Sequence, residues 1–191
     1  MQVRPDNPLI VQGDGKVLLE TQHPQYETTR DFLSRFSELE ASPDLLHTYR
    51  IGPLSLWNAA SAGMTLGEIV EGLQSRSKFD VPPGVLTTIE ETIERYGLVK
   101  LIPHPDSPET LLRLEFASGF IAKLLSNEES LREFMVEDGR RYWAVQQGHR
   151  GIFKQRALQA GWPIQDIAGF VTGGHLDVQL RTEMRFSRRA F

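Results

Sequence analysis

The chain has 191 residues, of which 40% are hydrophobic and 24% charged, and its formal net charge is −4. This composition is typical of one folded domain or two small ones, and it excludes global disorder. The chain has no cysteine, which excludes disulfide bonds, thiolate zinc sites and a cysteine nucleophile. No apolar run approaches the roughly 20 residues of a membrane span and the N-terminus is not a signal peptide, so we expect a soluble intracellular protein.

The first residues predict a β-hairpin followed by a helix. Two apolar runs flank Gly13-Asp14-Gly15, and a tight turn of this kind requires positive φ. A helix then begins at Pro24, because proline suits a first turn, where its missing N–H costs no hydrogen bond. Short extended segments follow near Leu39 and over residues 47–51.

The next stretch predicts two helices in succession. Pro53 begins the first, and Gly63 ends it because glycine tolerates the left-handed conformation beyond a last turn. Thr65, with Glu68 three residues later, predicts a capping box at the start of the second helix.

A third helix and a hairpin complete this part of the chain. The helix follows Pro83 and ends at Gly97, and strands are predicted over 98–102 and 111–116. Three helices followed by a two-stranded hairpin is the order of a winged helix, whose third helix often lies in the DNA major groove.

A second unit follows the hairpin. Helices are predicted over 118–126, 128–136 and 150–160, and strands over 142–145 and 176–180. The predicted fold class is α+β, with a hairpin and winged-helix-like domain over 1–116, a small α+β domain over 117–180 and a linker or tail over 181–191.

The charge is divided unevenly along the chain. Residues 140–191 contain nine Lys and Arg and three Asp and Glu, a net charge of +6, so residues 1–139 carry −10. The third predicted helix carries Glu90, Glu91 and Glu94 against Arg95 alone. Because a basic surface attracts phosphate and an acidic one repels it, any DNA contact is expected in the rear part, and the third helix is poorly suited to a groove.

One ordered string is unusually specific: His-Thr-Tyr-Arg-Ile at 47–51, running into Pro-Leu-Ser-Leu-Trp-Asn-Ala-Ala at 53–60. Shorter phrases of the same kind lie at 8–12, 17–20, 23–24, 77–78, 81–82, 96–97 and 151–170. Together they resemble the N-terminal, non-motor region of the XPB family of superfamily 2 DNA repair helicases, which includes the translocase of eukaryotic TFIIH. The resemblance is dense over 8–102 and 150–180 and thin between 103 and 149. The long acidic insertion of eukaryotic members is missing, which favours a prokaryotic or viral source.

The resemblance implies a division of labour. Residues 8–116 would dock protein partners, such as a regulatory subunit or a repair nuclease. Residues 117–180 would form a damage-recognition element that contacts DNA beside the motor. The resemblance also implies a role in nucleotide excision repair, in association with the nucleoid in the cytoplasm and not with a membrane. Helicase motor domains would follow downstream of this region.

The motifs that bind a nucleotide in such a motor are missing from this sequence. It contains no Gly-x-x-x-x-Gly-Lys-Ser/Thr phosphate loop and no Asp-Glu-x-His magnesium motif. A motor needs a loop of backbone N–H groups and a lysine to hold the β- and γ-phosphates. We therefore expect no catalytic residue and no cofactor in this chain, with ATP and Mg²⁺ bound only by a downstream motor.

The candidate DNA-binding residues are basic side chains of the rear part, because arginine forks onto phosphate and aromatic rings stack on bases. They are Arg150, Lys154 and Arg156 in the predicted basic helix and Arg185, Arg188 and Arg189 in the tail. Trp143 and Trp162 lie near the first three in sequence. The alternative is an amphipathic helix with ordinary basic residues facing water.

The candidate partner-docking residues lie in the front part. They are His47, Tyr49 and Arg50 on an extended segment and Glu90, Glu91 and Glu94 on the third helix. The structural alternative places Tyr49 in the core, His47 and Arg50 at the end of the adjoining helix, and the glutamates in solvent. Trp57 is expected in the core. The five histidines lack metal-ligand spacing, so no metal site is expected.

Three functions remain open at this point. The first is an accessory region of an XPB-type helicase that positions the motor on DNA, docks partners and hydrolyses nothing itself. The second is a stand-alone winged-helix DNA-binding regulator, and the third is a pure protein-interaction module. The acidic third helix counts against the second.

Overall fold

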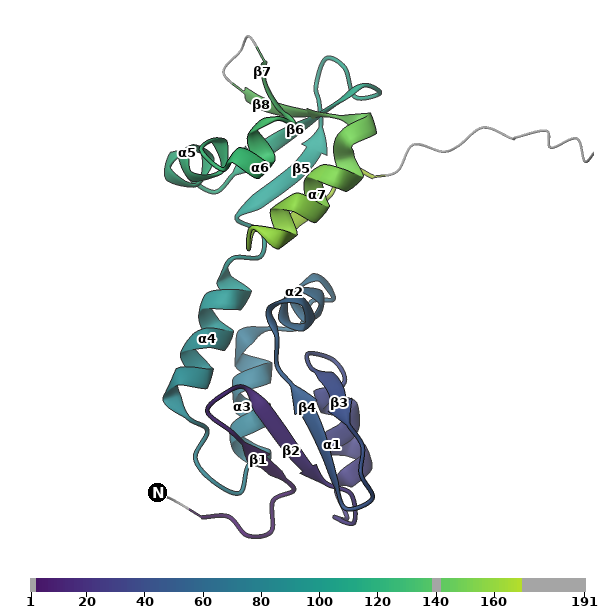
Figure 1. The fold of residues 1–191 in the computed structure, drawn as a ribbon, viewed down its shortest axis with the longest axis vertical. Coiled ribbons are helices and arrows are strands. Elements are labelled where there is room, and N and C mark those ends of the chain that lie inside the picture. Colours follow the sequence, from purple (N-terminus) through teal and green to yellow (C-terminus); the bar gives the residue numbers. More distant parts are fainter. Residues whose placement is uncertain (1–2, 139–141, 170–191) are drawn as a thin grey trace, which may run out of the picture.

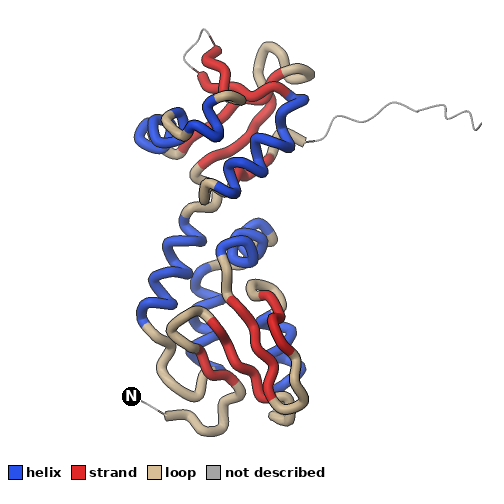
Figure 2. Tube along the Cα trace, in the orientation of Figure 1, coloured by secondary structure: helices blue, strands red, loops and turns tan. Residues whose placement is uncertain are grey.

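The chain folds into two units joined end to end in an elongated molecule (Figure 1). In the computed structural model the described residues are 3–138 and 142–169. Each unit combines a sheet with helices, as the colouring by secondary structure shows (Figure 2). The predicted α+β fold class is therefore confirmed.

The first unit contains a four-stranded antiparallel sheet in the order β1-β2-β4-β3. Its strands are β1 (Leu9–Val11), β2 (Lys16–Glu20), β3 (Glu38–Ala41) and β4 (Leu46–Arg50). Its helices are α1 (Tyr26–Leu33), α2 (Pro53–Ser61), α3 (Leu66–Arg76) and α4 (Pro83–Glu94).

Local sequence signals account for several of these elements. Gly15, with φ of +82°, forms the turn of the β1–β2 hairpin, and the Asp14 carboxylate accepts a 3.1 Å hydrogen bond from the Lys16 N–H. At the start of α3, the Thr65 N–H donates to the Glu68 carboxylate at 2.7 Å, and the Glu68 N–H donates to the Thr65 hydroxyl at 3.2 Å. The hairpin turn and the capping box are both confirmed.

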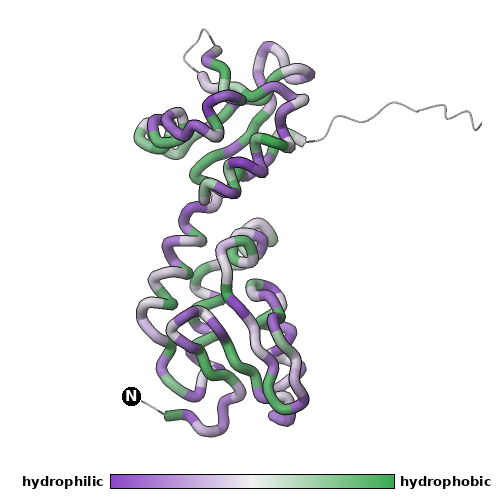
Figure 3. Tube along the Cα trace, in the orientation of Figure 1, coloured by the Kyte–Doolittle hydropathy of each residue, from purple (hydrophilic) through white to green (hydrophobic). Residues whose placement is uncertain are grey.

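The core of the first unit is one apolar cluster between the sheet and the helices. The strands contribute Leu9, Val17 and Leu19, α3 contributes Ile69 and Leu73, and α4 contributes Val85 and Ile89; all are buried. In Figure 3 β2 is coloured mainly as hydrophobic, whereas parts of α4 are coloured as hydrophilic. The alternating strand pattern therefore supplies one wall of the core and the helical stripes supply the other.

The second unit contains a five-stranded sheet in the order β7-β8-β6-β5-β9, in which only the β5–β9 pair is parallel. Its strands are β5 (Val99–Pro103), β6 (Leu111–Phe116), β7 (Met135–Asp138), β8 (Tyr142–Gln146) and β9 (Ile164–Asp166). Its helices are α5 (Gly119–Ser126), α6 (Glu129–Arg132), the 3-10 turn η1 (Gln147–His149) and α7 (Arg150–Gln159).

The structure differs from the winged-helix expectation at the hairpin. The expected wing, β5 and β6, lies in the second sheet, and its buried side chains Leu101, Leu112 and Leu114 join the cluster that contains Leu125 and Phe153. β8 pairs with one edge of this hairpin and β9 with the other, so the hairpin forms the centre of the second sheet. Its apolar face is covered by α5, α6 and α7. The two clusters favour a boundary before residue 98, while the boundary at 116/117 stays a prediction.

Two further expectations in the second unit have different outcomes. The helix predicted over 128–136 is shorter, because α6 ends at Arg132 and the chain then enters β7, whose Met135 is buried against the cluster. The strand predicted over 176–180 lies outside the described residues.

The connection between the units is short. Gly97, with φ of +86°, follows α4 and leads directly into β5, and Gly63 and Gly161, with φ of +86° and +82°, likewise follow α2 and α7. Gly63 and Gly97 were predicted as helix-ending glycines, and both are confirmed. Among the described residues, no helix is both long and apolar enough to cross a lipid bilayer.

Candidate nucleic-acid interface

The predicted basic helix is present as α7. Phe153 and Ala157, one turn apart, are fully buried and fix this helix against the second sheet. Ile152, next to Phe153 in the sequence, is 37% exposed. The burial of Phe153 and Ala157 sets which of the charged residues on the helix reach solvent.

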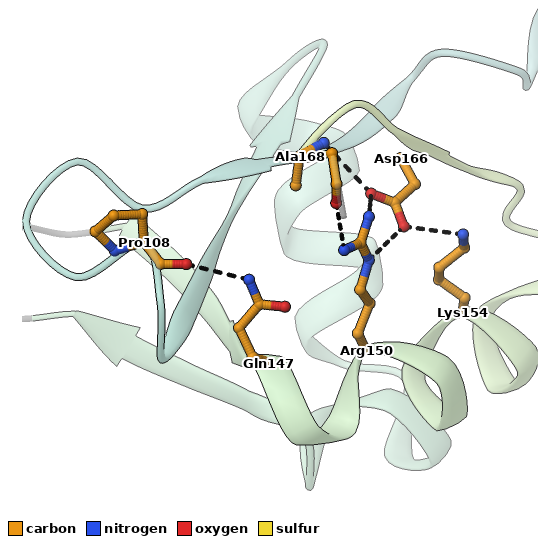
Figure 4. Close-up of polar contacts among 7 residues, drawn as sticks. Pro108, Gln147, Arg150, Lys154, Asp166 and Ala168 are labelled. Carbon is orange, nitrogen blue, oxygen red and sulfur yellow. Dashed lines mark hydrogen bonds and ion pairs between the residues drawn. The ribbon is translucent and has the colours of Figure 1, made fainter. Parts of the chain in front are cut away.

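Arg150 does not face solvent as expected. Its guanidinium forms a two-pronged ion pair with Asp166 of β9, with Nε–Oδ2 and Nη2–Oδ1 distances of 2.7 and 2.6 Å (Figure 4). Its Nη1 also donates to the carbonyl oxygen of Gly169 at 2.6 Å. Only 14% of the Arg150 side chain and 8% of the Asp166 side chain are exposed. The guanidinium N–H groups that could bind a phosphate therefore already bind the Asp166 carboxylate.

Lys154 lies on the same side of α7, one turn further along. Its Nζ donates to Asp166 Oδ2 at 2.9 Å, but 41% of its side chain remains exposed. Burial raises the pKa of Asp166, but the hydrogen bonds and charges of Arg150 and Lys154 outweigh this effect, so its pKa is lowered. Asp166 is therefore a carboxylate that anchors β9 to α7 and neutralises part of the basic helix.

Arg156 is the remaining candidate on α7, and it is exposed. We expected Arg150, Lys154 and Arg156 to form one outward patch, but the burial of Phe153 turns Arg150 toward β9 and leaves Arg156 in solvent. Their contact with DNA stays a prediction, as does that of Arg185, Arg188 and Arg189, which lie outside the described residues.

The candidate docking residues of the front part take up structural roles on β4. Tyr49 is 4% exposed and belongs to the first cluster, and burial raises the pKa of its phenol. His47 Nδ1 lies 3.0 Å from the hydroxyl of Tyr26, the first residue of α1, and Arg50 pairs with Glu40 of β3. Tyr49 therefore lies in the core, whereas His47 and Arg50 are partly exposed, and the docking role of the three residues stays a prediction.

Glu90, Glu91 and Glu94 lie on the exposed side of α4, as the structural alternative expected. The opposite side of the helix is fixed by Ile89 in the core and by Trp57, whose indole N–H donates to the Thr92 carbonyl at 2.8 Å. Trp57 is thus a core residue, as predicted. Among the described residues, no group of three His, Asp or Glu side chains could hold a metal ion.

A groove of about 420 Å³ separates the two units. One wall is α2, with Leu54 and Asn58, and the other is α7 and the segment after it, with Lys154, Leu158 and Pro163. The exposed part of Lys154 therefore borders this groove.

Sequence reasoning missed two features of the second unit. It did not predict that Asp166 pairs with the cations of α7, because Asp166 lies 16 residues after Arg150 and 12 residues after Lys154, in a different element. It also missed the contact of Arg113 with Tyr142, in which the guanidinium carbon lies 3.7 Å from the ring centroid. The alternation of β6 was the only signal for that pair, since it places Arg113 opposite the apolar face.

Comparison with known proteins gives the family. Residues 9–138 match the family model described as helicase conserved C-terminal domain. The chain is 38% identical over 178 residues to the DNA 3'-5' helicase XPB of Mycobacterium tuberculosis, covering 93% of this chain and 32% of that protein. It is 36% identical over 168 residues to the DNA 3'-5' helicase XPB of Kineococcus radiotolerans, covering 88% and 30%.

A eukaryotic protein is also similar. The Drosophila melanogaster general transcription and DNA repair factor IIH helicase/translocase subunit XPB is 37% identical over 126 residues, covering 59% of this chain and 16% of that protein. The chain thus spans about a third or less of the length of these relatives. It belongs to the helicase conserved C-terminal domain family and, within it, is an XPB-type superfamily 2 helicase region.

Proposed function

We propose that this chain is an accessory region of an XPB-type ATP-dependent DNA helicase or translocase that acts in DNA repair. In this role it positions the motor on DNA, docks protein partners and hydrolyses no nucleotide itself. The observation that carries the proposal is the combination of similarity to XPB helicases over 93% of the chain with a sequence that lacks a phosphate-loop motif.

The place of the chain within a parent protein is part of the proposal. The matching family is described as a C-terminal domain, whereas the phrases at 47–60 and 151–170 resemble the segment before the first motor domain. We place the chain ahead of the motor, with ATP and Mg²⁺ bound there, in the cytoplasm of a prokaryotic or viral system. A purified chain that turns over ATP in the presence of Mg²⁺ would contradict this arrangement.

The proposed DNA contact is in the rear part, where the net charge of residues 140–191 is +6. Arg156 is exposed on α7, and Lys154 is partly exposed beside it. Such cations bind phosphates and release counterions, so affinity for a DNA duplex is expected to fall with salt, with a log–log slope of roughly −0.9 for each phosphate neutralised.

The test is a salt titration of duplex binding, measured by fluorescence anisotropy. We expect Arg156→Glu to weaken binding and to make the slope shallower by about one phosphate contact. The matched control is Arg30→Glu, which changes the charge equally on the exposed side of α1 in the acidic front part. Arg150 and Lys154 are left unchanged in this test, because both hold Asp166.

The other two functions have distinct outcomes in the same experiment. Preference for one duplex sequence would favour a stand-alone regulator. Absence of binding at low salt would favour a pure protein-interaction module.

Partner docking is assigned to the front part. The exposed glutamates of α4 carry charge that phosphate would repel, so a protein surface rich in Lys and Arg is the favoured occupant. The Drosophila relative is named as a subunit of a repair factor, and we extend a partnership of that kind, with a regulatory subunit or a nuclease, to this chain. Co-purification of the chain with its partner, lost in a Glu90→Lys/Glu91→Lys/Glu94→Lys variant, would test the assignment.

A further inference from the structure

The second sheet has two unlike faces. Val99, Leu101, Leu112, Leu114 and Val145 are buried against α5, α6 and α7, which all lie on one side of this sheet (Figure 1). Because successive side chains of a strand point to opposite faces, the alternate residues of β5, β6 and β8 project to the other side. We call this second side the open face.

Side chains of three adjacent strands meet on the open face. Arg113 of β6 lies opposite Ile102 of β5 and Ala144 of β8, and Lys100 lies opposite Glu115. The partly exposed residues are Lys100, Ile102 and Arg113, whereas Glu115 and Tyr142 are exposed. This group contains the cations Lys100 and Arg113 and the anion Glu115, and Asp138 of β7 lies opposite Tyr142 in the strand register.

Arg113 and Tyr142 form the centre of the open face. The Arg113 guanidinium carbon lies 3.7 Å from the centroid of the Tyr142 ring, which is a close cation–π contact. The Arg113 Nε is buried, and no described residue accepts a hydrogen bond from it. Tyr142 nevertheless remains 37% exposed. The pair therefore combines the guanidinium of a partly exposed arginine with an aromatic ring accessible to solvent.

We propose that the open face binds single-stranded DNA, with the exposed part of the Tyr142 ring stacked on an unpaired base and Arg113 donating to a neighbouring phosphate. This inference rests on the proposed function, which supplies DNA as the ligand. An aromatic ring beside a cationic side chain binds single strands with little sequence preference, because every base offers a π-face. A paired base is already stacked within its duplex, so the ring favours an unwound strand.

The test compares a fluorescein-labelled oligothymidylate with a labelled duplex at one low salt concentration, using the full chain. We expect Tyr142→Ala to weaken binding of the single strand about tenfold, whereas Tyr142→Phe keeps the aromatic ring and the affinity. Arg113→Lys keeps the charge but loses the planar fork, so it is expected to weaken single-strand binding as well. The duplex affinity of Tyr142→Ala is expected to be unchanged.

Arg132→Ala is the control for a general charge effect, since Arg132 is an exposed cation of α6 on the helical side of the sheet. A folded Tyr142→Ala protein, checked by circular dichroism, that binds oligothymidylate as tightly as the original would overturn the inference while leaving the duplex result intact. The same holds if Arg132→Ala weakens single-strand binding as strongly as Tyr142→Ala. Failure of the original chain to bind either DNA would remove the inference and the proposed DNA contact together.

Discussion

Arg150 and Asp166 join α7 to β9 through two hydrogen bonds of 2.7 and 2.6 Å between largely buried side chains. Arg150, which the sequence suggests as a phosphate ligand, therefore has a structural role in holding α7 against β9. It also positions β9, whose Asp166 lies opposite Leu101 of β5.

Asp166→Asn is expected to destabilise the chain by about 3 kcal/mol, because it leaves the largely buried Arg150 guanidinium without its counter-charge. The measurement is the free energy of unfolding in urea. Glu109→Gln, which removes one negative charge from an exposed loop position of the same unit, is the control and should change stability by less than about 0.5 kcal/mol. Equal effects of the two substitutions would show that the ion pair is not an anchor.

The two cations that hold Asp166 are expected to contribute unequally. Arg150→Ala removes a fork that is 14% exposed and should cost about 3 kcal/mol, whereas Lys154→Ala removes a contact that is 41% exposed and should cost less than about 1 kcal/mol. Thermal and urea unfolding of both variants would check the order. A larger loss for Lys154→Ala would be inconsistent with the geometry.

Asp166 also predicts a pH dependence. Its pKa is lowered in the folded state relative to about 3.9 in an unfolded chain. A lowered pKa contributes stability that is fully present above the unfolded value and is lost as pH falls through the folded value. The difference in unfolding free energy between the original chain and Asp166→Asn should therefore be constant at neutral pH and shrink on acidification below about pH 4. If this difference in unfolding free energy increased below about pH 4, it would contradict a lowered pKa of Asp166 in the folded state.

Two glycines of α3 should respond oppositely to alanine. A Cβ on Gly72 would lie 2.1 Å from the Phe32 ring, which is itself in contact with Phe36 and Arg76, so Gly72→Ala should destabilise the first unit. A Cβ on Gly67 meets nothing within 4 Å, so Gly67→Ala should stabilise the helix by about 0.5–1 kcal/mol. Unfolding midpoints in urea would reveal both effects, and a stabilising Gly72→Ala would mean that the Phe32 ring moves aside without cost.

Trp57→Phe should cost about 2 kcal/mol, because the indole N–H caps the Thr92 carbonyl near the end of α4 and phenylalanine leaves that carbonyl without a donor. The comparison is Trp162→Phe in the second unit, where Trp162 is partly exposed. Urea unfolding followed by circular dichroism would separate the two, and a smaller loss at Trp57 would argue against the cap.

The amino-acid sequence by itself determined most local features, because each depends on neighbours within a few residues. The β1–β2 turn at Gly15, the capping box of Thr65 and Glu68 and the helix end at Gly97 all formed as predicted. The helices α3 and α4 likewise begin where the capping box and Pro83 predicted them. Membership of the helicase family was also readable from the order of residues 47–60.

Only the tertiary structure decided which elements share a core and which charges remain exposed. The β5–β6 hairpin reads as a wing until β8 and β9 pair with it, since strand pairing links segments remote in sequence. The sequence suggests that Arg150 is an exposed cation, whereas in the structure its guanidinium binds Asp166, which lies 16 residues away in the sequence. Arg113 and Tyr142 meet only because β6 and β8 are neighbours, and this non-local packing produces the surface to which we assign single-stranded DNA.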